Sequence, residues 1–123
     1  MEILTSAIAI FIIFMKLFFF HCIGDFALQN YFVAANKGSL MFIHCTIYTG
    51  IMYFALWLLI PDITSNGLIS SALFIFVLHY SADNITCNVV TRNKSMAGRM
   101  FILNQIIHIL IMCFVYFCNV RGI

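Results

Sequence analysis

Four long apolar segments decide what this chain can fold into. They cover residues 3–24, 40–60, 68–90 and 100–119, and short polar connections separate them. A helix of roughly 20 apolar residues crosses the hydrocarbon core of a bilayer, and a spanning segment must pair its own backbone groups. We therefore predict an all-α membrane protein with four transmembrane helices in a bundle. Residues 1–123 would form a single integral membrane domain.

The composition agrees with a lipid bilayer as the main partner. The chain is 64% hydrophobic and 8% charged, with a mean hydropathy of +1.09, whereas roughly a quarter of the residues of a soluble domain are charged. The net charge of +2 is small and scattered, so no nucleic-acid partner is expected. The first segment begins near Glu2, is too long for a signal peptide and contains Lys16. We interpret it as a retained span.

The Lys and Arg residues of the connections are unevenly distributed. The middle connection holds neither residue type, whereas the first and third hold Lys37, Arg92, Lys94 and Arg99. Short cytoplasmic loops are rich in Lys and Arg. We therefore predict that the first and third connections face the cytoplasm and that both termini lie outside.

Two of the segments carry the same pair of ionisable residues. His21 is followed four positions later by Asp25 and then by Gln29, and His79 is followed four positions later by Asp83. Residues at this spacing lie on one face of a helix. Ionisable groups inside a membrane usually face a protein interior or a watery cavity, so each pair is expected to point into the bundle.

Single histidines, His44 and His108, occupy the other two segments. In the predicted orientation all four histidines lie in the cytoplasmic half, so we expect them to share one polar layer. The order of polar residues also repeats, which indicates two parallel helix-pair repeats. The repeated series are His21-x3-Asp25, Asn36-Lys37, His44 and His79-x3-Asp83, Asn93-Lys94, His108.

Three kinds of site fit such a layer. The aspartates could accept hydrogen bonds from the imidazoles and fix their tautomers. Alternatively, imidazoles and carboxylates together could bind a divalent cation such as zinc, manganese or iron. The third interpretation is a relay for protons or other ions.

The metal interpretation assigns a role to each residue. The expected ligands are His21, His79, His108 and, as a fourth ligand or an orienting group, His44. The residues expected to act as ligand or catalytic base are Asp25 and Asp83. The supporting side chains are Gln29, Asn104, Gln105 and Lys16. Lys16 either extends its amine toward the nearer membrane surface or pairs with one of the two aspartates.

Read in order, the polar motifs are His21-x-x-Gly24-Asp25-Phe26-x-Leu28-Gln29, Asn36-Lys37, His44, Leu78-His79-x3-Asp83 and Phe101-Ile102-Leu103-Asn104-Gln105-x-x-His108. Together they resemble the bacterial and phage membrane proteins grouped as domain of unknown function 3307. The motifs extend over essentially the whole chain. The resemblance implies a small multi-pass protein of the bacterial inner membrane, and it brings no established activity.

The chain departs from the family pattern at one position. Where the family has an aspartate before the glutamine of the last motif, this chain has Asn104. An amide can donate and accept hydrogen bonds but cannot serve as a carboxylate base. Any such role would therefore pass to Asp25 or Asp83.

The leading functional hypothesis is a metal-dependent membrane hydrolase, in which the cation lowers the pKa of a coordinated water. Its substrate would be lipid-soluble or a lipid head group. The alternatives are a proton or ion relay or transporter component, and a non-catalytic bacterial or phage adaptor whose polar layer only fixes helix register. We also predict a homo-oligomer. Small residues that allow close helix approach lie in the second and third segments: Gly50, Ser70, Ser71 and Ala72.

Overall fold

The computed structural model describes residues 2–27 and 39–120, and these residues are almost wholly helical. Four helices are long and apolar enough to cross a membrane. The elements are α1 (Glu2–Cys22), the π-helical turn η1 (Ile23–Ala27), α3 (Ser39–Leu59), α4 (Ser65–Arg92), the 3₁₀ turn η2 (Lys94–Met96) and α5 (Ala97–Val120). The predicted helical class and the number of spans agree with this structure.

The connection between α4 and α5 is much shorter than the loop expected at residues 91–99. Helix α4 continues to Arg92, and Asn93 then ends one helix and starts the next turn. The Asn93 backbone N–H donates to the Val89 carbonyl, while its Oδ1 accepts from the N–H and hydroxyl of Ser95. Asn93 therefore caps both helical elements, and most residues of the expected loop are helical instead.

Helix α4 also begins earlier than residue 68. The Thr64 side chain accepts a hydrogen bond of 2.9 Å from the Gly67 backbone N–H. This is an N-cap, which satisfies one of the donors that the first helical turn leaves unpaired. Thr64 and Ser65 therefore start the helix, although the sequence placed them in the turn.

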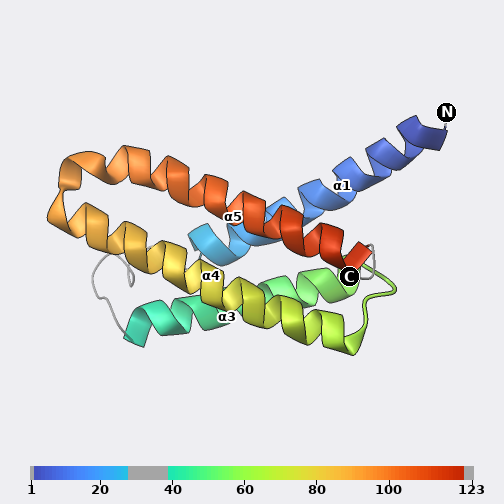
Figure 1. The fold of residues 1–123 in the computed structure, drawn as a ribbon, viewed down its shortest axis with the longest axis horizontal. Coiled ribbons are helices and arrows are strands. Elements are labelled where there is room, and N and C mark those ends of the chain that lie inside the picture. The colour runs from blue at the N-terminus through green and yellow to red at the C-terminus, as the bar shows by residue number, and fades with distance from the viewer. Residues whose placement is uncertain (1, 28–38, 121–123) are drawn as a thin grey trace.

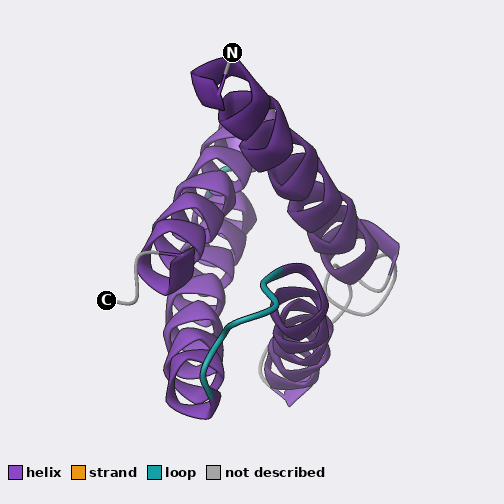
Figure 2. Ribbon diagram, turned by 90° about the vertical axis from the view of Figure 1, so that its right-hand side faces the viewer, coloured by secondary structure: helices purple, strands orange, loops and turns teal. Residues whose placement is uncertain are grey.

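The helices pack in sequence order, with α3 on α4 and α4 on α5, while α1 packs on α3. Helices α3, α4 and α5 run side by side, and α1 crosses them at an angle (Figure 1). The N-terminal end of α1 lies away from the other helices in both views (Figures 1 and 2). Residues 2–12 are all exposed, and the first buried side chain of α1 is Leu17. Only the C-terminal half of α1 is therefore packed against protein.

An apolar cluster fills the region between the helices beyond the polar residues. Its most buried members come from several helices: Leu17, Met52, Ala55, Leu56, Ile75, Met112 and Val115. The outer faces carry exposed Phe, Ile and Leu side chains, as a lipid-facing surface requires. This cluster supports one side of the candidate site described next.

Candidate metal centre

All four histidines and both aspartates of the predicted layer lie together in the interior. His21 lies in the last turn of α1, Asp25 lies in η1, and the remaining residues project from α3, α4 and α5. The six side chains are no more than 5% exposed. The shared layer predicted from the spacing of the residues is therefore present.

The local structure of η1 brings α1 close to α3. A Cβ added to Gly24 would lie 2.8 Å from Cδ2 of Tyr48, a distance that real Cβ atoms essentially never show. Glycine therefore permits the close approach that places Asp25 against the histidines. π-Helical turns are uncommon and often lie at functional sites.

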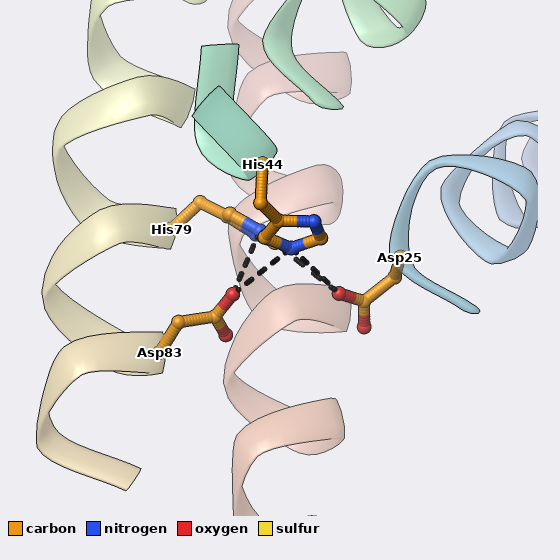
Figure 3. Close-up of side chains that lie close together, drawn as sticks. All are labelled: Asp25, His44, His79 and Asp83. Atoms are coloured by element: carbon orange, nitrogen blue, oxygen red, sulfur yellow. Dashed lines mark hydrogen bonds and ion pairs between the residues drawn. The ribbon is translucent and has the colours of Figure 1, made fainter. Parts of the chain in front are cut away.

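The tightest group consists of Asp25, His44, His79 and Asp83 (Figure 3). Both histidines point their Nε2 atoms toward the two carboxylates, and these two Nε2 atoms are 3.3 Å apart. The Asp83 Oδ2 atom lies 3.0 Å from His79 Nε2 and 3.3 Å from His44 Nε2. The Asp25 Oδ1 atom lies 3.5 Å from His44 Nε2 and 3.9 Å from His79 Nε2.

These five distances are close to five of the six edges of a small tetrahedron, and all four ligand atoms lie within 4.8 Å of one another. Zinc bonds nitrogen and oxygen ligands at roughly 2.0–2.2 Å, so the ligand atoms of a tetrahedral site lie roughly 3.3–3.6 Å apart. The observed separations run from 3.0 to 3.9 Å around that value. Two imidazoles and two carboxylates therefore converge closely enough that they could hold one divalent cation.

The outer oxygen of each aspartate is bound by a neighbouring amide of α5. Gln105 Nε2 donates to Asp25 Oδ2 at 2.8 Å. Asn104 Nδ2 donates to Asp83 Oδ1 at 3.0 Å and also to Thr86 Oγ1. Hydrogen bonds of this kind orient carboxylate ligands. They turn the inner oxygens, Asp25 Oδ1 and Asp83 Oδ2, toward His44 and His79.

His21 belongs to a chain of hydrogen bonds that ends on Asp25. Because Gln105 Nε2 donates to a carboxylate, its Oε1 is the atom that faces His21 and accepts from His21 Nε2–H at 3.0 Å. The other ring nitrogen of His21, Nδ1, then accepts from the Tyr48 hydroxyl at 2.5 Å. The neighbours thereby fix the tautomer of His21.

His108 lies between the two carboxylates. Its Nε2 is 3.3 Å from Asp83 Oδ1, and its Nδ1 is 3.6 Å from Asp25 Oδ2. Neither ring nitrogen makes a hydrogen bond within the described part of the chain. His108, His21 and Asp25 form a second group of potential metal ligands. Asp25 is common to both groups.

The grouping differs from the one preferred on sequence grounds. The sequence favoured His21, His79 and His108 as ligands of one cation, whereas the structure groups His44 with His79. Spacing along the chain could not settle this, because it gives the face of each helix but not the rotation of the four helices relative to one another. The assignment of all four histidines as ligands stays a prediction.

The supporting residues fall into different positions. Asn104 and Gln105 contact the aspartates as described, whereas Lys16 is exposed on α1. No ion pair joins Lys16 to Asp25 or Asp83 among the residues that the structure describes. The predicted role of Gln29 lies outside the described residues.

Tyr48 is a site residue that the sequence did not single out. Besides its bond to His21, its ring stacks on His79, with centroids 3.9 Å apart and an interplanar angle of 8°. The available signal was its position, since Tyr48 follows His44 by four residues and therefore shares its helix face. The chain has 14 Phe and five Tyr, so an aromatic residue at one position is not by itself a signal of a functional role.

Comparison with known proteins places the chain in a family. The family model described as "Protein of unknown function (DUF3307)" matches residues 13–122. No curated protein and no solved structure matches the chain significantly. The chain therefore belongs to the DUF3307 family, as the motifs of the sequence indicated.

Proposed function

We propose that this DUF3307 protein is a membrane metalloprotein that binds one divalent cation between Asp25, His44, His79 and Asp83. The observation that carries the proposal is the convergence of the four ligand atoms at near-tetrahedral separations. Their chemistry narrows the choice of cation. Two imidazoles with two carboxylates suit zinc, and also iron or manganese with additional ligands.

Charge supports a divalent ion at this depth. An ionised carboxylate is costly in a medium of low dielectric constant unless its charge is compensated. Two carboxylates, two neutral imidazoles and one divalent cation sum to zero net charge. The amide donors of Asn104 and Gln105 already bind the outer oxygens, so the ion would need only the inner ones.

We further propose that the chemistry at this site is hydrolysis. A divalent cation held here would lower the pKa of a water and so supply hydroxide near neutral pH, the nucleophile needed at an ester or phosphoryl centre. A small cavity of about 10 Å³ lies beside His79 and His108, which is about the space that one water occupies. Tyr48 also lines this cavity, next to apolar side chains. The substrate would be an ester or phosphate ester that reaches the site from the membrane.

Metal analysis of the full chain, purified in mild detergent, tests the binding proposal. We expect about one zinc ion per chain after dialysis against buffered zinc, and loss of most of it in Asp83→Asn and in His44→Ala. Losing a supporting group typically weakens binding about 10- to 100-fold, and losing a direct ligand should cost at least as much. The matched control is Asp62→Asn, which changes an exposed carboxylate outside the cluster. Equal zinc content in all four proteins would refute the site.

Hydrolysis needs its own test. The purified protein in nanodiscs would be assayed against carboxylic and phosphate esters before and after chelation, with zinc added back. We expect an activity that chelation removes and that zinc restores, absent in Asp83→Asn and kept in Asp62→Asn. If the protein binds zinc but hydrolyses none of these esters, the metal site stands and the proposal of hydrolysis is wrong.

We also propose an orientation in the membrane, which rests on the basic residues and not on the metal site. Arg92, Lys94 and Arg99 are all exposed around the connection of α4 and α5, so this end would face the cytoplasm. Reporter fusions at Ser95 should behave as cytoplasmic, and fusions at Asn66 as external. A cytoplasmic reporter at Asn66 would reverse the placement.

A further inference from the structure

The carboxylate of Asp25 is shared by two sets of potential ligands. Its Oδ1 faces the four-residue group, whereas its Oδ2 lies 3.9 Å from His21 Nε2 and 3.6 Å from His108 Nδ1. We infer that His21, Asp25 and His108 form a second cation position, which fills together with a phosphate monoester. This inference rests on the proposed function, since the first cation has to be present.

The geometry is that of a bridged pair of ions. A carboxylate that offers one oxygen to each of two cations holds them about 3.5–4 Å apart, as in many phosphatases and nucleases. In the second set, the separation of 3.6 Å lies at the upper end of the range for a zinc tetrahedron, and the separation of 3.9 Å is a few tenths of an ångström longer. Small side-chain movements would close them.

His108 is the residue that most needs a ligand. It is 1% exposed, and both of its ring nitrogens lack a hydrogen bond among the described residues. A buried polar group without a hydrogen bond costs free energy, although carboxylate oxygens lie at ion-pair distance, 3.3 and 3.6 Å, from the two nitrogens. A cation on Nδ1 would satisfy one of these nitrogens.

Gln105 makes the second position weaker than the first. Its side chain now bonds to Asp25 Oδ2 and to His21 Nε2, the two atoms that the second cation would bind. Gln105 is only partly buried, so it can turn away from the cluster. Its two hydrogen bonds must break before the ion binds, and this lowers the affinity.

Charge identifies the class of ligand that accompanies the second ion. Two divalent cations and two carboxylates leave a net charge of +2, which is costly inside a membrane protein. A phosphate monoester carries up to two negative charges near neutral pH, so it would restore neutrality. With three protein ligands, the second position also keeps open sites for it, as catalytic zinc sites do. The same chemistry describes inorganic phosphate and a lipid with a terminal phosphate.

Zinc and phosphorus content per chain test this inference. The full chain would be equilibrated with chelator-buffered zinc under four conditions. Two are in phosphorus-free detergent, without and with inorganic phosphate, and two are in nanodiscs, of phosphatidylcholine alone and with phosphatidic acid. We expect one zinc without a phosphate source and two zinc ions when either source binds. Bound phosphate should be one per chain in the inorganic-phosphate arm, where no lipid phosphorus is present. The arm in which the second zinc appears identifies the source.

Two variants change the second position in opposite directions. His108→Ala should hold one zinc under every condition, while Gln105→Ala should take up the second zinc at a lower zinc concentration than the unaltered chain. An unchanged helical circular dichroism spectrum would report that each variant is folded, because Gln105 also orients Asp25 at the first position. One zinc per chain under every condition would overturn the inference and leave the first site standing, as would a second zinc that survives His108→Ala. No zinc at all would overturn both proposals.

Discussion

The same three helices, α3, α4 and α5, contribute to two interiors of opposite character. On one side of Tyr48 lies the polar cluster of four histidines and two aspartates, and on the other lies the apolar cluster around Leu56, Ile75 and Val115. In lipid, burying an apolar side chain gains little, because the lipid is itself apolar. The apolar cluster is therefore held by close packing, and the polar cluster by bonds between particular atoms.

The first prediction separates the two clusters by their response to zinc. Zinc at about 1,000 times its Kd should raise the free energy of unfolding by about 4 kcal/mol, because only the folded state has the site. Leu56→Ala should lower that free energy by about 1–2 kcal/mol, since the cavity term survives in lipid and the transfer term largely does not. The zinc increment should be unchanged in this variant. Denaturant unfolding in detergent measures both quantities, and an increment that disappears in Leu56→Ala would mean that the clusters are coupled.

The second prediction adds charge to the polar cluster. Asn104→Asp removes a donor to Asp83 and places a carboxylate beside it. The free energy of unfolding of the metal-free protein should therefore fall by about 2–3 kcal/mol. Zinc should shrink this loss, because a cation compensates the added charge. The control is Asn66→Asp at an exposed position. A loss that is the same with and without zinc would count against a cation at this position.

A third prediction concerns the contact that joins α1 to α3. Gly24→Ala would force its new methyl group against Tyr48. Overpacking of this kind should lower the free energy of unfolding by about 1–3 kcal/mol. Zinc affinity should fall as well, because Asp25 would move. Gly50→Ala is the matched control, since no atom lies within 4 Å of a Cβ added there. Equal melting temperatures for the two variants would exclude the close approach.

The smallest effect is expected for the hydrogen bond between Asn119 of α5 and Ser71 of α4, which lies near the apolar cluster. Asn119 Nδ2 donates to Ser71 Oγ and also to the Val115 carbonyl. Ser71→Ala leaves the second bond in place, so it should cost only about 0.6 kcal/mol, a typical value for hydrogen bonds between transmembrane helices. Zinc content should not change. If the free energy of unfolding fell by several kcal/mol instead, this pair would be a major determinant of stability.

Much of this comparison could be predicted from the sequence. Long apolar segments dictate helices in a membrane, and the His21-Asp25 and His79-Asp83 spacings place each pair on one face. Burial of the pairs follows, because lipid does not solvate them. These inferences need only the chain's own periodicity and the character of the bilayer.

Other features depend on how the helices meet. The partnership of His44 with His79, and the stacking of Tyr48 on His79, require the relative rotations of α3 and α4. The early start of α4 at Ser65 and its late end at Arg92 depend on single capping side chains, Thr64 and Asn93. The residues on both sides of each cap are similarly polar, so the hydropathy pattern changes only gradually there. It therefore does not indicate where the helix begins or ends.

The position of α1 has a consequence for the order of assembly. Helices α3, α4 and α5 are joined by short connections and pack on their sequence neighbours, so their contacts close small loops and form at little entropic cost. Helix α1 packs only through its C-terminal half, yet it and η1 deliver His21 and Asp25. The cluster is then complete only when α1 docks, so uptake of the proposed cation would report the last step in the assembly of the four helices.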